Sequence, residues 1–237
     1  MTVTRAPIAV ALDGPDLATV TTWAAAAGPH VSAMKVGLET FLRDGDNAVR
    51  SVRVSAPECA LFLDLKLHDI PNTVAGAARS IAHLRPDFLT VHASGGAAMI
   101  AAAVDALPDT RITAVTVLTS LGEADLDAVG LRGPALEAAC RLARLAVSAG
   151  ARAIVCSPQE VSAIRAEVPP DITLITPGVR PAGADLGDQS RVATPEQALA
   201  DGADLLVVGR PIIAAGDPRA AASAIAAEME KAGAPGR

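Results

Sequence analysis

The residues best suited to chemistry lie in one short run, Asp64-Leu65-Lys66-Leu67-His68-Asp69. In an extended strand successive side chains point to opposite faces, so Asp64 and Lys66 share one face while Leu65 and Leu67 occupy the other. Carboxylates beside a lysine favour its ammonium form, because opposite charges stabilise each other. A held ammonium can donate a proton, so this run predicts acid-base chemistry at the end of a strand.

Two more charged residues, Asp13 and Lys35, follow other apolar runs in the same way. A single Asp-Lys pair at a strand end is commonly structural, and Asp64 and Lys66 alone would favour that interpretation. Burying further charge without a function is costly, however. The additional Asp13 and Lys35 therefore favour a catalytic role for the whole group.

A second signal lies near the end of the chain, where Val207-Val208-Gly209-Arg210 precedes a segment of helical spacing. The preceding apolar run ends in Thr176-Pro177-Gly178. The last two strand-helix loops of an α/β barrel often bind phosphate. Gly209 allows the backbone to approach a ligand closely, and Arg210 offers a forked cation, so the two predict a phosphate subsite.

All of these positions follow short apolar runs that alternate with Ala-rich segments of helical spacing. The eight candidate strands are residues 8–12, 31–36, 60–65, 88–92, 112–118, 153–156, 172–176 and 205–208. Eight strand-helix units in this length favour an α/β fold of the (β/α)8 TIM-barrel type, whose chemistry lies at the carboxyl ends of the strands. A doubly wound sheet is the alternative, but Asp13-Gly14-Pro15-Asp16 stands where its GxGxxG turn is expected.

Residues 1–237 are expected to form one domain, because apolar residues make up 51% of the chain and occur along its whole length. A short flexible tail is expected from about residue 232. Residues 180–189 are rich in Gly, Ala, Pro and Asp and lie between the seventh strand and the next helix. Such a composition predicts a mobile lid.

Composition excludes several classes of function. A net charge of −6 and only 2% aromatic residues argue against a nucleic-acid partner, which needs a basic face or stacking platforms. Apolar runs of membrane-spanning length and a signal peptide are both missing, which predicts a cytoplasmic protein without a membrane partner. The three cysteines are widely spaced in apolar segments, and we expect neither disulfides nor a metal site.

The run Phe62-Leu63-Asp64-Leu65-Lys66-Leu67-His68-Asp69-Ile70-Pro71-Asn72-Thr73 resembles the signature of the orotidine 5′-phosphate decarboxylases, in the branch common among bacteria. Further landmarks occur in the order of that family between residue 8 and about residue 212: Ala11-Leu12-Asp13, Lys35-Val36-Gly37, Val91-His92-Ala93, Leu118-Thr119-Ser120, Thr176-Pro177-Gly178-Val179-Arg180 and Val208-Gly209-Arg210. The resemblance implies a cofactor-free barrel that converts orotidine 5′-phosphate (OMP) to uridine 5′-phosphate (UMP) in pyrimidine biosynthesis.

The resemblance also implies roles for individual residues. Lys66 would donate a proton to C6 of the pyrimidine, and the charge network around it would contain Asp64, Asp69 and Lys35. Substrate-binding roles are implied for residues at the strand ends and on the expected lid: Asp13, Lys35, Asp64, Thr73, Thr119, Arg180, Gln189, Gly209 and Arg210. A homodimer is implied in which Asp69 and Thr73 reach the site of the neighbouring subunit.

Two alternatives remain open from the sequence. One is a metal-dependent sugar-phosphate decarboxylase or synthase of the same wider group, which has a similar Asp-x-Lys-x-x-Asp cluster. Those relatives place a carboxylate metal ligand where this chain has Lys35, and a cation there would repel a metal ion. The other is a barrel that binds phosphorylated metabolites without chemistry, which would explain Arg210 but not the group of strand-end charges.

Overall fold

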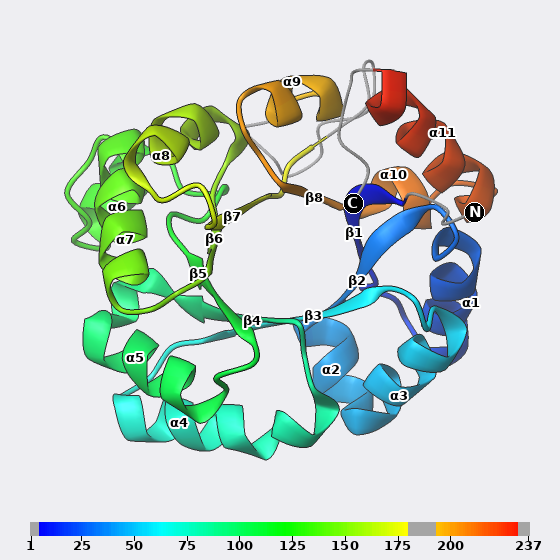
Figure 1. Cartoon of the computed structure of the whole chain (residues 1–237), viewed down its shortest axis with the longest axis horizontal. Helices are drawn as coiled ribbons and strands as arrows, with labels where there is room; N and C mark the ends of the chain where they lie inside the picture. The colour runs from blue at the N-terminus through cyan, green and yellow to red at the C-terminus, as the bar shows by residue number, and fades with distance from the viewer. Residues whose placement is uncertain (1–4, 180–192, 232–237) are drawn as a thin grey trace.

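Parallel strands close into a barrel in the computed structural model, which describes residues 5–179 and 193–231. The strands pair in sequence order, and the last pairs with the first. They are β1 Ala6–Ala11, β2 Val31–Gly37, β3 Ala60–Leu67, β4 Phe88–His92, β5 Arg111–Val115, β6 Ala153–Val155, β7 Thr173–Thr176 and β8 Leu205–Val208. Figure 1 looks along the barrel and shows the helices as a ring outside it. The predicted (β/α)8 barrel is confirmed.

The helices of the ring are α1 Leu17–Ala27, α2 Leu38–Asp44, α3 Asp46–Ser55, α4 Pro71–Ser80, α5 Ala97–Ala106, α6 Glu123–Ala128, α7 Ala135–Ser148, α8 Val161–Glu167, α9 Pro195–Ala200, α10 Arg210–Ile213 and α11 Pro218–Lys231. Three short 3-10 turns, η1 Ala82–Leu84, η2 Ala93–Gly95 and η3 Pro158–Glu160, complete the order. Helix starts carry expected signals: the Asp16 carboxylate accepts the Thr19 N–H at 2.8 Å, and Pro71 opens α4. No helix in the described ranges is long and apolar enough to cross a membrane.

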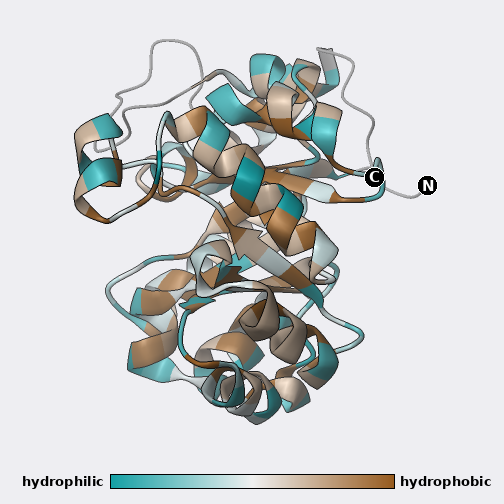
Figure 2. Cartoon of the chain, turned by 90° about the vertical axis from the view of Figure 1, so that its left-hand side faces the viewer, coloured by the Kyte–Doolittle hydropathy of each residue, from teal (hydrophilic) through white to brown (hydrophobic). Residues whose placement is uncertain are grey.

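Alternation along the strands divides the apolar residues between two regions. In β1, Ile8 and Val10 belong to the large core between barrel and helices, whereas Ala9 belongs to a smaller cluster inside the barrel. That inner cluster contains Ala9, Ala33, Phe62, Phe88, Ala153, Ile175 and Leu205. The helices carry brown and teal residues side by side in Figure 2, as expected where one face packs on the barrel and the other meets solvent.

Two strands end at least two residues away from their predicted ends. The fifth strand was expected over residues 112–118, but β5 ends at Val115. Just beyond it, the backbone N–H and the hydroxyl of Thr116 both donate to the Val155 carbonyl, at 3.1 and 3.0 Å, and the chain then turns away to form part of the cavity wall. The third strand was expected to end at residue 65, but β3 continues to Leu67 through an irregular stretch described below. The expected lid at 180–189 and tail from about 232 lie outside the described residues.

Candidate active site

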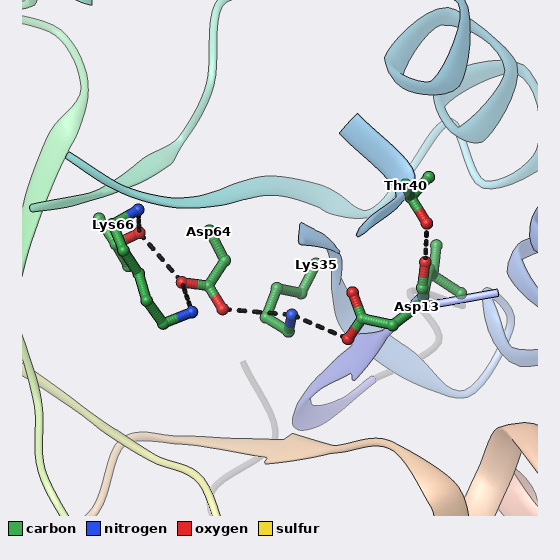
Figure 3. A network of polar contacts seen from close by, with 7 residues as sticks. Asp13, Lys35, Thr40, Asp64 and Lys66 are labelled. Carbon is green, nitrogen blue, oxygen red and sulfur yellow. Dashed lines mark hydrogen bonds and ion pairs between the residues drawn. The ribbon is translucent and has the colours of Figure 1, made fainter. Parts of the chain in front are cut away.

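Four of the predicted site residues form a continuous chain of ion pairs at the carboxyl ends of β1, β2 and β3. Lys66 Nζ lies 2.8 Å from Asp64 Oδ1, and the other oxygen of Asp64 lies 3.2 Å from Lys35 Nζ. Lys35 Nζ is in turn 3.3 Å from Asp13 Oδ2. Figure 3 shows this order, with the charges alternating along the row. We call Asp13, Lys35, Asp64 and Lys66 the charge network.

Strand register brings the charge network together. Lys35 pairs with Ala11 across β1 and β2, and Asp64 pairs with Gly37 across β2 and β3, so the polar residues lie at one level of the barrel. The end of β1 is held from outside, because the buried Thr40 hydroxyl donates to the Leu12 carbonyl at 2.7 Å (Figure 3). The backbone immediately before Asp13 is thereby attached to α2.

Gly37 leaves the space that the charge network needs. A Cβ atom at this position would lie 2.2 Å from Asp13 Oδ1 and 2.9 Å from Lys35 Nζ. Any larger residue would therefore push these two side chains away. Sequence reasoning quoted Gly37 as part of a motif but gave it no role, and its position two residues after Lys35 was the available signal.

Lys66 does not lie in a regular strand, contrary to the simple alternation expected from sequence. Leu63 pairs with Leu89, but the next pair is Leu67 with Val91, so three residues of β3 face one residue of β4. Lys66 itself has a φ of +50°, in the left-handed region that non-glycine residues rarely occupy. Leu65 and Leu67 do pack on the outer core, as expected. The bulge bends the strand and directs the lysine to Asp64.

Electrostatics keeps the interior of the charge network ionised. Burial disfavours the Lys35 ammonium, but the carboxylates of Asp64 and Asp13 outweigh it and raise the pKa of Lys35 above its ordinary value of 10.5. Burial also disfavours the Asp64 carboxylate, but Lys35 and Lys66 outweigh it and hold the pKa of Asp64 below 3.8. The shifts of the two partners agree, so each holds the other in its charged form near neutral pH.

Three members of the charge network, Lys35, Asp64 and Lys66, form one wall of a cavity of about 190 Å³. Thr119, another predicted binding residue, lies on the cavity wall after β5. The rest of the wall is mostly apolar and consists of Phe62, Val115, Val117, Leu118, Val155, Cys156, Pro177 and Val207. A charged side facing an apolar side suits a planar ring with a charged substituent, because desolvation strengthens the electrostatic contacts of the bound group.

Among the described residues, neither Asp69 nor Thr73 makes an ion pair or side-chain hydrogen bond with the charge network of its own chain. Both are exposed, at and just before the start of α4. The Asp69 carboxylate accepts the Ile70 N–H at 2.6 Å, and among the ion pairs between described residues none involves Asp69. Ile70 between them is 66% exposed and is one of several large apolar side chains at the surface of the described residues.

The predicted phosphate residues are only partly described. Gly209 precedes α10, and a Cβ atom there would approach Ala11 Cβ at 3.4 Å, so the backbone lies close to β1. Arg210 is exposed and is the first residue of α10, on the rim after β8. Arg180 and Gln189 lie outside the described residues.

Two neighbouring histidines and three cysteines are further titratable side chains among the described residues. His68 and His92 have ring centroids 5.4 Å apart, and burial, followed by the charges of His68 and Lys66, lowers the pKa of His92 below 6.5. The three cysteines are free and buried, and burial raises the pKa of the Cys59 thiol to about 11. The described residues contain no group of three or more histidine, cysteine or acidic side chains placed to hold a metal ion.

Sequence reasoning also missed Thr90. This residue of β4 is fully buried, and its hydroxyl contacts both Asp64 and the backbone of Lys66. The signal was a polar residue within the apolar run Phe88-Leu89-Thr90-Val91, on the strand face shared with His92.

Fold and site together define a class: barrel enzymes with alternating carboxylates and lysines at the mouth. Residues 6–225 match the family model described as "Orotidine 5'-phosphate decarboxylase / HUMPS family". The chain belongs to this family.

Relatives and solved structures agree with that assignment. The chain is 71% identical to the orotidine 5′-phosphate decarboxylase of Thermobifida fusca (strain YX), over 97% of this chain and 98% of the relative. It is 60% identical to the enzyme of that name from Anaeromyxobacter sp. (strain K), over 94% and 97% of the two chains. The crystal structure of orotidine 5′-phosphate decarboxylase from Lactobacillus acidophilus superimposes with a TM-score of 0.80 at 35% identity, covering 94% of this chain and 98% of that one.

Proposed function

We infer that this protein is a carboxy-lyase that decarboxylates orotidine 5′-phosphate to UMP and carbon dioxide, the last step of de novo UMP synthesis. The observation that carries the inference is the charge network, which places a lysine ammonium beside an aspartate at the wall of a largely apolar cavity. Sequence identities of 71% and 60% to relatives named for this activity, over 97% and 94% of this chain, support the same substrate.

Loss of carbon dioxide breaks the bond between C6 and the carboxylate carbon and leaves the electron pair on C6. Without an electron sink in the substrate, this charge needs a fixed opposite charge beside it. The Lys66 ammonium supplies that charge and then gives its proton to C6, becoming a neutral amine that regains a proton from solvent. Asp64 holds the ammonium in place through the contact at 2.8 Å.

The other predicted residues bind different parts of the substrate. Asp13 and Lys35 bind the ribose hydroxyls, and Thr119 contacts the ligand near the base. Gly209, Arg210, Arg180 and Gln189 bind the phosphate. Binding the remote phosphate contributes energy that holds the base against the charge network. Support for the two described phosphate residues is their place on the rim after β8.

The enzyme acts as a homodimer in which Asp69 and Thr73 enter the site of the other subunit. Supporting this proposal, both residues are exposed beside the barrel mouth, and the apolar Ile70 between them is also exposed. We also propose that the protein is cytoplasmic, as the sequence predicts. Three free thiols support this location, because they suit a reducing compartment.

Ultraviolet absorbance of OMP tests the activity directly. Purified enzyme should consume OMP at the same rate with and without excess EDTA, whereas a metal-dependent sugar-phosphate relative would need its metal and a different substrate. Lys66→Ala should abolish turnover, and unchanged turnover would refute the proton-donor role. Arg210→Ala should chiefly raise KM, and unaltered UMP affinity would remove Arg210 from the phosphate site.

Mixed dimers test the shared site. Lys66→Ala and Asp69→Asn subunits should each be inactive alone, but a mixed dimer contains one site with both native residues. Random mixing makes half of the dimers mixed, so about one quarter of native activity should return. No recovery on mixing, with exchange of subunits verified by mass, would contradict the homodimer proposal.

A further inference from the structure

Thr90 makes two hydrogen bonds that meet at the charge network. Its hydroxyl oxygen accepts the backbone N–H of Lys66 at 2.8 Å, and the hydroxyl donates to Asp64 Oδ1 at 3.0 Å. The side chain is fully buried, so water does not compete for either bond. Asp64 Oδ1 is also the atom that receives Lys66 Nζ at 2.8 Å.

These contacts form a closed ring. It runs from the Lys66 N–H to the Thr90 hydroxyl, on to Asp64 Oδ1, and back to the ammonium of the same Lys66. The direction of each bond is determined by chemistry, because an N–H only donates and an ionised carboxylate only accepts. The Thr90 hydroxyl can therefore accept a hydrogen bond from Lys66 and donate one to Asp64 at the same time.

The backbone of Lys66 needs such a partner. Thr90 is the single β4 residue opposite the three residues of the β3 bulge, so regular strand pairing is interrupted at Lys66. Lys66 has a φ of +50°, and a non-glycine residue persists in this region only when its surroundings enforce it. The Thr90 hydroxyl replaces the missing strand partner and keeps the bulge in this shape.

We propose that Thr90 is a positioning residue for decarboxylation, holding the Lys66 ammonium at the reacting carbon through the Lys66 backbone and the Asp64 carboxylate. The proposal rests on the proton-donor role proposed for Lys66. Thr90 is not among the cavity-lining residues, so it acts through its neighbours and not by touching the substrate. Its removal should therefore affect the chemical step more than substrate binding.

Three substitutions separate this role from simple packing. Thr90→Val keeps the shape of the side chain and replaces the hydroxyl with a methyl group. Thr90→Ser keeps the hydroxyl and loses the methyl group, and Thr90→Ala loses both. Thr113→Val is a matched control, because Thr113 is also fully buried on a barrel strand but donates only to Arg111 of its own strand at 2.9 Å. Each variant is measured for kcat, KM for OMP, UMP affinity and thermal unfolding.

We expect Thr90→Val and Thr90→Ala to lower kcat by about 100-fold, the effect typical of a misplaced catalytic group, while UMP affinity changes by less than about threefold. Thr90→Ser should restore kcat to within about fivefold of the native value, and Thr113→Val should leave it within about twofold. Should Thr90→Val fail to fold, the contrast between the serine and alanine variants decides the question.

Native kcat in Thr90→Val or Thr90→Ala would overturn the positioning role, as would equal losses in the serine and alanine variants. Equal losses of kcat and UMP affinity would also overturn it, because they indicate a general collapse of the site. Lys66→Ala is assayed alongside. If it retains turnover, the proton-donor role of Lys66 itself fails. If Lys66→Ala is inactive and Thr90→Val is fully active, only the positioning role of Thr90 is refuted.

Discussion

Replacing Asp64 with asparagine removes the charge between Lys35 and Lys66 while nearly preserving the size of the side chain. Lys35 is the most deeply buried member of the charge network, with 8% of its side chain exposed, and it lies 3.2 Å from Asp64 Oδ2. After the substitution, Lys35 keeps only Asp13 at 3.3 Å as an ionic partner within the network. We expect the free energy of unfolding to fall substantially.

The geometry sets the size of the effect. At an effective dielectric constant of about 20, opposite charges at this separation attract by roughly 5 kcal/mol before desolvation is counted. Breaking a buried ion pair by removing one partner typically costs about 3 to 5 kcal/mol. Because Asp13 still neutralises Lys35, we expect the lower end, about 3 kcal/mol. Asp13→Asn should cost only about 1 kcal/mol, since 37% of that side chain is exposed and solvent screens it.

Calorimetry at pH 7 measures both variants. For a chain of this size, about 3 kcal/mol corresponds to a fall in Tm of roughly 6 to 12 °C, and Asp13→Asn should lower Tm by about 2 to 4 °C. In the double variant Lys35→Met with Asp64→Asn no buried ammonium is left, so the loss should be smaller than the sum of the two single losses. Strict additivity, or an Asp64→Asn loss no greater than that of Asp13→Asn, would refute the reasoning.

Two further predictions concern residues around the charge network. Gly37→Ala should displace Asp13 and Lys35 and weaken OMP binding by about tenfold or more, measured as KM; an unchanged KM would show that the contact at 2.2 Å is relieved without moving the network. His92 has a pKa below 6.5 when folded, so the unfolded chain binds its proton first and stability falls as pH drops through 6.5 towards the folded value. His92→Asn should reduce the difference in Tm between pH 8 and pH 5, and an equal or larger difference would contradict this assignment.

The sequence by itself determined the fold class, the order of the strands and the positions of the charged residues. Apolar runs with polar ends are local patterns, and they indicate buried strands without any knowledge of which strands will be neighbours. The same patterns identified Asp13, Lys35, Asp64 and Lys66 as strand-end charges. The family motif around Lys66 then indicated the chemistry, because its residue types and spacing are visible without any fold.

Only the tertiary structure decided how the lysine is aimed and which groups hold it. The β3 bulge, the left-handed Lys66 backbone and the Thr90 hydroxyl depend on hydrogen bonds between residues 24 and 26 positions apart. The need for glycine at position 37 likewise arises from side chains of two other positions that meet above its Cα. Local periodicity describes which face a residue prefers, whereas strain, close approach and shared partners exist only after distant strands have paired.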